Sequence, residues 1–316
     1  MSLNPLLSIT LERTPTQVET NGKLVLAVLP IVPMTQTNVV EAYYIDDGSY
    51  RLLWSIPSEI DWYETRLALD KEYANILVWD RNVINPETIR LRLYTVGGVL
   101  VTTQEVTLTV DPVVATFSSN YVIVYNASSL HFYTVPTLSE FLTTDVQGPA
   151  HDITTFVVDC HEYTALLSSN SSSNVTAWIY SLPRIGKLGI SLGAPKLLDS
   201  TSFPSNGNGD VSSWKNLVSL STDQGKIGLL TLCDKEIKPL YLASVTGSLI
   251  DNVLLDSVLL TADTQYLYIF DVCDRKFLKL METVPAVAPV AALGGQCDYV
   301  AVAFGPLVYL YRVCCR

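Results

Sequence analysis

Charge is scarce in this chain, and positive charge is scarcest. Only 16% of the 316 residues are charged, and 20 Lys and Arg against 31 Asp and Glu give a formal net charge of −11. About 25% is typical of globular proteins. No run of Lys and Arg is longer than two, whereas nucleic-acid binding requires clustered basic residues. We therefore expect no direct nucleic-acid binding, and the low charge favours an apolar surface that another protein covers.

Targeting and membrane-spanning segments are also missing. Residues 1–14, MSLNPLLSITLERT, contain no basic region followed by an apolar core, so no secretory signal is expected. The longest apolar run, residues 23–34, is interrupted by Pro30 and Pro33 and is shorter than the roughly 20 residues of a membrane span. These absences predict an intracellular protein, cytoplasmic or nuclear, with no membrane insertion.

Motifs for catalysis and metal binding are absent as well. No GxSxG elbow accompanies a serine. The six cysteines include no CxxC pair, and neither HxH nor helical i, i+4 spacing relates the three histidines, His131, His151 and His161. The acidic pair in IDDGSY (45–50) is explained by a hairpin turn, because Asp-Gly favours positive φ. We predict no catalytic residue, no metal site and no cofactor.

What the sequence does contain is a succession of short β-type segments. Runs such as KLVLAVLP, YVIVYN and LYIFDV are rich in β-branched and aromatic residues and are bounded by Gly, Pro, Asn, Asp or Ser. No window of about 12 residues keeps a helical period. The nearest candidate, LSEFLTT (138–144), is too short to form a stable helix. The sequence predicts an all-β protein.

One short phrase recurs along the chain. It consists of an aliphatic or aromatic residue, a large apolar residue, usually Ser, Thr or Asp, and then an aliphatic residue. Successive copies are 39 to 50 residues apart, and their large residues are Trp54, Tyr94, Tyr133, Tyr180, Leu230, Phe270 and Tyr311. A period of about 40 to 45 residues with four strands per period is typical of propeller blades. The number of copies predicts seven blades.

The segment YIFDVCDRKFLKL (268–280) carries this phrase most clearly. It resembles the end of the fourth strand of a WD-repeat blade, with Phe270 in the Trp place and Asp271 in the Asp place. The Gly-His dipeptide of well-formed WD repeats is missing, and the Asp of the tight turn is kept only at Asp223 and Asp263. The resemblance covers nearly the whole chain and implies a divergent, WD-repeat-like, seven-bladed β-propeller with four antiparallel strands per blade.

Placing the phrase on the fourth strand divides one propeller domain, residues 1–316, into seven approximate blades: 1–57, 58–97, 98–136, 137–183, 184–233, 234–273 and 274–316. On this assignment segments such as LLSITLE, KPLYLAS and FLKLMET are inner strands and supply no converging set of carboxylates. No strand remains to close the ring by exchange, so closure would depend on packing of blade seven against blade one. The only Trp-Asp dipeptide, Trp79-Asp80, falls 15 residues before Tyr94 and is expected on a third strand.

The function predicted from these features is that of a non-enzymatic scaffold. The low charge, the acidic balance and the missing catalytic motifs favour a subunit of a larger intracellular complex whose partners are other protein subunits. The alternatives are a propeller-type hydrolase or lactonase with a site in the central channel, and a structural coat subunit.

Two places are candidates for partner binding. The longest spacings contain SSNSSSNV (168–175), between the third and fourth strands of blade four, and DSTSFPSNGNGD (199–210), between the first and second strands of blade five. Both connections are expected on one face of the ring, where Phe203, with Asn206 and Asp210, would contact a partner. The second place is the adjacent pair Trp62 and Tyr63, because neighbours on a strand face opposite sides and one is then exposed.

Overall fold

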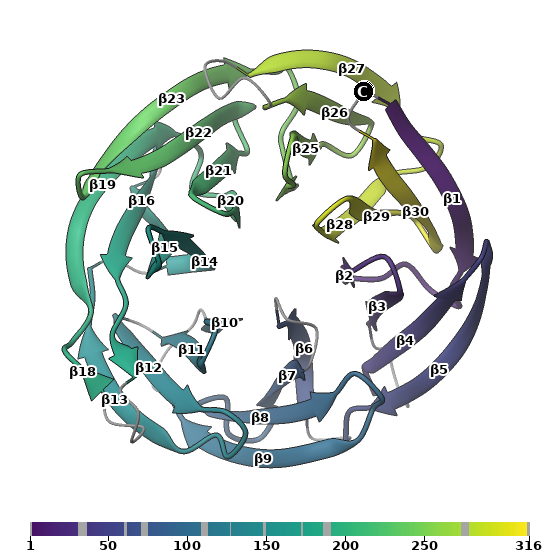
Figure 1. Cartoon of the computed structure of the whole chain (residues 1–316). Helices are drawn as coiled ribbons and strands as arrows, with labels where there is room; N and C mark the ends of the chain where they lie inside the picture. Colours follow the sequence, from purple (N-terminus) through teal and green to yellow (C-terminus); the bar gives the residue numbers. More distant parts are fainter. Residues whose placement is uncertain are drawn as a thin grey trace.

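The computed structural model describes residues 2–30, 37–59, 62–70, 75–108, 113–126, 128–147, 150–171, 173–185, 191–272 and 278–314. These residues form strands, turns and loops and include no helix. Seven four-stranded antiparallel sheets follow one another around a ring, as Figure 1 shows. The all-β, seven-bladed propeller predicted from the sequence is confirmed.

Each blade is named here by its strands from the centre of the ring outward. Blades one to three contain β2 (Gln17–Thr20), β3 (Leu24–Leu29), β4 (Val39–Asp46) and β5 (Ser49–Pro57); β6 (Trp62–Leu69), β7 (Asn75–Asn82), β8 (Thr88–Thr95) and β9 (Leu100–Thr107); and β10 (Val113–Phe117), β11 (Tyr121–Asn126), β12 (Ser129–Thr134) and β13 (Glu140–Asp145). Blades four to six contain β14 (Ala150–Val158), β15 (His161–Ser171), β16 (Asn174–Ser181) and β19 (Lys196–Pro204); β20 (Gly209–Trp214), β21 (Leu217–Thr222), β22 (Lys226–Cys233) and β23 (Glu236–Ser244); and β24 (Asp251–Leu254), β25 (Val258–Ala262), β26 (Tyr266–Asp271) and β27 (Lys279–Pro285). A small hairpin of β17 (Arg184–Ile185) and β18 (Ser191–Leu192) precedes β19.

Both ends of the chain build the seventh blade. Its inner three strands are β28 (Val290–Gln296), β29 (Tyr299–Phe304) and β30 (Leu307–Cys314), and its outermost strand is β1 (Ser2–Thr10). In Figure 1 the purple β1 lies beside β30 on the outside of the ring. The ring is therefore closed by strand exchange, and the expectation of closure by face packing alone is wrong. LLSITLE belongs to the outside of blade seven, because the inner strand of blade one is β2.

The predicted blade boundaries need the same correction, because the repeated phrase lies on the third strand of a blade in six of its seven copies. Third strands have a neighbour on both edges and a blade on both faces, so they are almost continuously buried, as in β8 and β26. Fourth strands have a free edge, and most of their residues are exposed in β5, β9 and β27. The predicted boundaries therefore fall one strand too early in most blades.

The large residue of the phrase marks the same irregularity in every blade. At this point the outermost strand contains one extra residue opposite the third strand, which is a β-bulge. The third-strand residues at which the pairing shifts are Tyr43, Tyr94, Tyr133, Tyr180, Leu230, Phe270 and Tyr311. Six of these seven were identified from the sequence. In blade one the residue is Tyr43, whereas Trp54 lies on the outermost strand β5.

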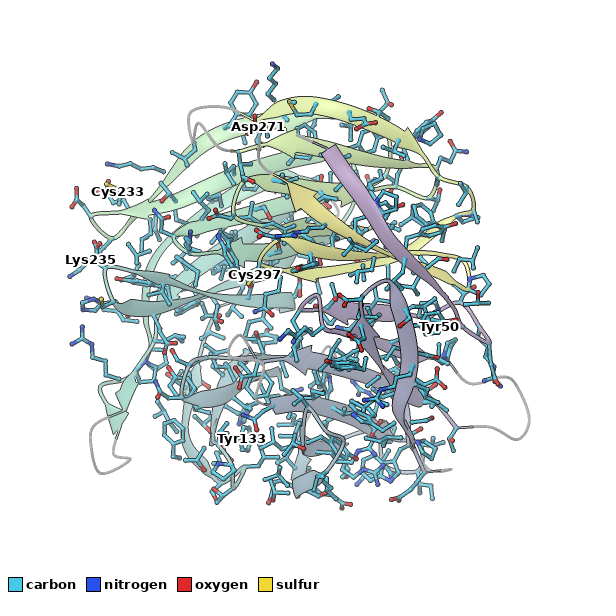
Figure 2. All side chains as sticks on the ribbon, turned by 45° about the vertical axis from the view of Figure 1, so that its right-hand side comes forward. Tyr50, Tyr133, Cys233, Lys235, Asp271 and Cys297 are labelled. Atoms are coloured by element: carbon cyan, nitrogen blue, oxygen red, sulfur yellow. The ribbon has the colours of Figure 1, made fainter. Side chains whose placement is uncertain are left out.

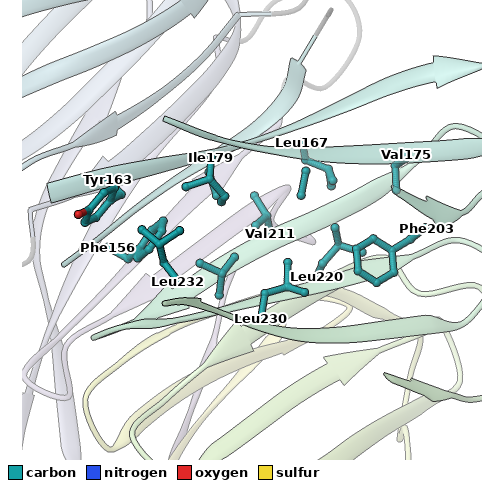
Figure 3. Packing of buried hydrophobic residues seen from close by; sticks show 13 residues of the cluster. Phe156, Tyr163, Leu167, Val175, Ile179, Phe203, Val211, Leu220, Leu230 and Leu232 are labelled. Atoms are coloured by element: carbon teal, nitrogen blue, oxygen red, sulfur yellow. The ribbon is translucent and has the colours of Figure 1, made fainter. Parts of the chain in front are cut away.

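Apolar side chains fill the spaces between neighbouring blades. Tyr94 of blade two packs with Leu26 of blade one, and Phe270 of blade six packs with Leu217 of blade five. Figure 3 shows the space between blades four and five, where side chains from the two facing sheets interdigitate. The repeated residues thus pack between blades, with Trp54 and Tyr311 only partly buried at the edges of their clusters.

The Trp-Asp dipeptide lies on β7, the second strand of blade two rather than the third. Asp80 is fully buried. Its Oδ2 accepts hydrogen bonds from Arg92 Nη2 at 2.5 Å and Arg90 Nη2 at 3.3 Å, and its Oδ1 accepts one from Thr65 Oγ1 at 2.7 Å. Arg90 in turn lies over the ring of Trp62, 4.2 Å from its centroid. The dipeptide does not mark the repeat, but its aspartate holds two buried arginines.

Candidate functional site

The innermost strands of the seven blades surround a cavity of about 1000 Å³ on the axis of the ring. Figure 1 shows these strands converging on the open centre. An innermost strand has a free edge that faces this channel, so some of its backbone N–H groups have no partner within their own sheet. Side chains from neighbouring blades supply the missing acceptors.

Three aspartates supply such acceptors from consecutive blades. Asp152 lies on β14, Asp210 on β20 and Asp251 on β24. In each case Oδ2 accepts a backbone N–H from the next innermost strand; the donors and distances are Val211 at 2.7 Å, Asn252 at 2.8 Å and Leu293 at 2.7 Å. We call these three contacts the carboxylate clamps. They join blades four, five, six and seven in sequence.

Gln17 on β2 makes a neutral version of the same contact between blades one and two. Its Oε1 accepts the Leu67 N–H at 3.0 Å, and its Nε2 donates to the Leu67 carbonyl at 2.8 Å. The inner strands are thus joined by a side-chain amide between blades one and two and by carboxyl groups between blades four and seven.

The carboxyl groups of the clamps are coupled to one another. Burial and, to a smaller extent, the charge of Asp251 raise the pKa of Asp210 to about 8. Burial also raises the pKa of Asp251 to about 7 and the pKa of Asp152 well above its ordinary value. The charge of Asp210 raises the pKa of Asp152, and the charge of Asp152 raises the pKa of Asp251. The three carboxyl groups therefore titrate together rather than independently.

Other ionisable groups face the same channel. Burial raises the pKa of Glu19, on β2, to about 8, and it lowers the pKa of His151, next to Asp152. Arg66, on β6, also lines the cavity. One sector of the channel is therefore rich in carboxyl groups that can take up protons near neutral pH.

The expectation that the inner strands supply no converging carboxylates is wrong. The segments first assigned to the inside of the blades, such as KPLYLAS and FLKLMET, form the outermost strands β23 and β27. The true inner strands contain His151-Asp152, Gly209-Asp210 and Ile250-Asp251. This recurring Asp at the start of a short strand is a sequence signal that becomes readable only when the strand order is correct.

The predicted interaction residues are placed very differently from one another. Trp62 is 6% exposed and lies under Arg90, so it is not an exposed anchor. The side chain of Tyr63 lies outside the described residues. Phe203 is 5% exposed and belongs to the core between blades four and five, and Asp210 lies in the channel. The expected exposure of Phe203 is wrong, because β19 pairs with β16 through this residue.

Asn206 is exposed, and it lies where the two long connections meet. The connections are β15 to β16 and β19 to β20, and the Ser205 N–H donates to the Ser173 carbonyl at 3.0 Å. They share one face of the ring, as predicted, although each lies one strand earlier in the order of strands than expected. Asp223 holds the second loop, because its Oδ1 accepts the Asn206 N–H at 2.8 Å. Of this predicted surface, Asn206 remains accessible.

Within the described part of the chain, no group of three or more His, Cys, Asp or Glu side chains is arranged to hold a metal ion. Cys160 and Cys233 are exposed free thiols, and Figure 2 shows Cys233 near Lys235 at the rim of the molecule. Cys297 lines the channel. The side chains of Cys273, Cys314 and Cys315 lie outside the described residues. Nor do the described residues include a helix long and apolar enough to cross a membrane.

Comparison with known proteins identifies the fold. No protein-family model and no curated protein sequence matches the chain. Solved structures do match: the RRP9 WD40 repeats at 11% identity and a TM-score of 0.63, covering 98% of this chain and 100% of that one; BamB from Moraxella catarrhalis at 12% and 0.57, covering 98% and 100%; and the computationally designed Ika8 protein at 11% and 0.58, covering 98% and 99%. At such identities the likeness concerns the fold. The chain is therefore a WD-repeat-like seven-bladed β-propeller.

Proposed function

We propose that this propeller is a non-enzymatic scaffold that binds other protein subunits through its outer wall. The observation that carries the proposal is a group of exposed apolar side chains on the outermost strands of blades one and two. We call it the blade 1–2 patch, and it consists of Leu52, Leu53, Val99, Leu100 and Val101, which are 38% to 64% exposed.

The patch is continuous across the two blades because Trp54 joins them. The Trp54 Nε1 donates to the Val96 carbonyl at 3.0 Å, and its ring packs on Gly98 in the turn between β8 and β9. Leu53 and Val99 are the chain neighbours of these contact points. Tyr50, 41% exposed, extends the apolar surface along β5 on the outer wall in Figure 2. Exposed apolar groups gathered in one place are typical of protein-binding surfaces.

A hydrolase or lactonase with a channel site is supported less well. The channel does contain several carboxyl groups, as such an enzyme requires. However, Asp152, Asp210 and Asp251 each accept a backbone N–H of the next blade, so their oxygens serve the structure of the ring. The acidic, weakly charged composition is consistent with a subunit of a larger intracellular complex in the cytoplasm or nucleus. This location and this complex stay predictions from the sequence.

The proposal is tested by affinity purification of the tagged chain from native extract. The variant Leu53→Glu with Val101→Glu places charge in the blade 1–2 patch, and Leu242→Glu with Leu280→Glu is the matched control. Leu242 and Leu280 are 60% and 46% exposed on the outermost strands β23 and β27. Circular dichroism and gel filtration first establish that both variants fold.

We expect the wild type and the control to retain the same stoichiometric partners and the patch variant to lose them. Loss of an interface anchor costs about 2 kcal/mol or more, roughly a thirtyfold weakening. Equal recovery of partners by the patch variant and the wild type would contradict the assignment of this surface.

A further inference from the structure

The three carboxylate clamps have a property that neither the scaffold proposal nor the fold requires. They follow one another around the channel, because Asp152 holds the N–H of Val211, the residue after Asp210, and Asp210 holds the N–H of Asn252, the residue after Asp251. Each carboxyl group also holds the backbone of the following blade. We propose that these three groups form a proton-sharing latch that tightens blades four to seven at mildly acidic pH and loosens them at alkaline pH.

Asp210 is joined to the next blade by more than one hydrogen bond. Asp210 Oδ2 accepts both the backbone N–H of Asn252 at 2.8 Å and its side-chain Nδ2 at 2.7 Å. Asn252 Nδ2 also donates to the Asp210 carbonyl at 2.8 Å. If all three groups are ionised, they repel one another while they still hold the strands between them.

Nothing basic offsets the carboxyl groups directly. Among the described residues, no Lys or Arg side chain is hydrogen-bonded or ion-paired with any of the three. The other ionisable side chains that line the cavity include His151 on β14 and Glu19 on β2, and Glu64, Arg66 and Arg81 in blade two, where Arg81 is paired with Glu64. Lys215, at the end of β20, is bound to Asp256 at 2.5 Å. The packed strands β10, β21, β25 and β28 contain no charged residue. Protons are therefore the available means of reducing the charge.

The direction of the pH effect follows from the raised pKa values. An unfolded aspartate has a pKa of about 3.9, so between that value and about 8 the folded chain binds protons that the unfolded chain does not. The stability from this source is fully present below the unfolded pKa and is lost as the pH rises through the folded pKa. Each such proton makes the unfolding equilibrium constant rise about tenfold per pH unit within this window.

The test compares denaturant unfolding of the wild type and Asp210→Asn at several pH values from 6 to 9. Asparagine keeps an oxygen for the Asn252 N–H and offers an amide donor to Asp152, but it does not titrate. Asp256→Asn, at an exposed carboxylate in the turn after β24, is the matched control. Hydrogen exchange of β20, β24 and β28 reports the clamps directly, since their donors are the amides of Val211, Asn252 and Leu293.

We expect the wild type and Asp256→Asn to become less stable from pH 6 to 8 and to lose exchange protection in these three strands. Asp210→Asn should show a slope smaller by about one proton, or about tenfold less change per pH unit. Contributions from Glu19 and His151 are present in all three proteins and cancel in the comparison. Equal slopes in the wild type and Asp210→Asn would overturn the latch, as would wild-type stability that increases with pH. If Asp210→Asn does not fold, Asp251→Asn decides by the same slope.

Discussion

Phe203 and Gly228 give the sharpest test of the packing between blades. Phe203 lies on β19, the outermost strand of blade four, and its ring covers Gly228 on β22 of blade five. A Cβ atom added at Gly228 would lie 2.8 Å from Phe203 Cε1 and 2.9 Å from Cζ. A real Cβ needs a clearance of more than 3 Å, so one of the two groups has to move. Figure 3 shows the ring of Phe203 at one end of this cluster.

Three single variants and one double variant follow from this contact. Phe203→Ala removes a ring that is 5% exposed and should lower the free energy of unfolding by about 3 to 5 kcal/mol. Gly228→Ala overpacks the same place and should cost about 1 to 3 kcal/mol. With Phe203→Leu the smaller side chain leaves room for the new methyl group, so the double variant Phe203→Leu, Gly228→Ala should be more stable than the sum of its single changes predicts, by about 0.5 kcal/mol or more.

Urea denaturation followed by circular dichroism measures all four free energies. Gly97→Ala is the matched control, because a Cβ at Gly97 would meet only Thr95 Oγ1, at 3.7 Å, and should change stability by less than about 0.5 kcal/mol. A cost below about 1 kcal/mol for Phe203→Ala, or strict additivity in the double variant, would refute this account of the interface. It would also reopen the interpretation of Phe203 as a partner-binding residue.

Three further results are expected. Tyr94→Ala and Tyr133→Ala, at residues 5% and 1% exposed, should each lower the free energy of unfolding by about 3 to 5 kcal/mol, whereas Trp54→Ala should lower it less because Trp54 is only partly buried. Thermal unfolding ranks the three variants, and equal losses of stability would contradict the placement of Trp54. Asp80→Ala leaves Arg90 and Arg92, 5% and 6% exposed, without their shared carboxylate, and should cost about 3 to 5 kcal/mol in urea denaturation; a loss under about 1 kcal/mol would show that the pair is dispensable. Removing residues 2–10 exposes the edge of β30, so light scattering should detect association of the shortened chain, and a monomer with unchanged melting temperature would argue against closure by β1.

The periodicity of the sequence was sufficient for the fold but not for the order of strands within a blade. Tyr94, Tyr133, Tyr180, Leu230, Phe270 and Tyr311 recur because each accompanies a bulge and fills the space next to the preceding blade, and a spacing pattern detects both. The pattern does not say whether its strand is third or fourth. Exposure of the following segments decides this: Val101 to Thr107 and Leu280 to Val284 are exposed at most positions because their strand has a free edge.

The candidate site depended on that strand order. Asp152, Asp210 and Asp251 are single acidic residues in unremarkable contexts, and nothing in their local sequences indicates that they meet. They converge because three short innermost strands point their free edges at one axis, which is a property of the closed ring. The prediction that Phe203 contacts a partner was wrong for a related reason. Its polar neighbours suggested a loop, but the pairing of β19 with β16 continues through Ser202, Phe203 and Pro204 and turns the aromatic ring inward.

Because β1 closes the ring, it cannot pair until β30 has been synthesised. Residues 2–10 are synthesised before the other strands of the ring, yet their partner β30 spans residues 307–314, and Ser2 pairs with Cys314. At about 5 to 20 residues per second, some 15 to 60 seconds pass before that partner exists. During this interval β1, with Leu3, Leu7 and Ile9, is an apolar strand without a sheet, and so it is a natural early ligand for a chaperone.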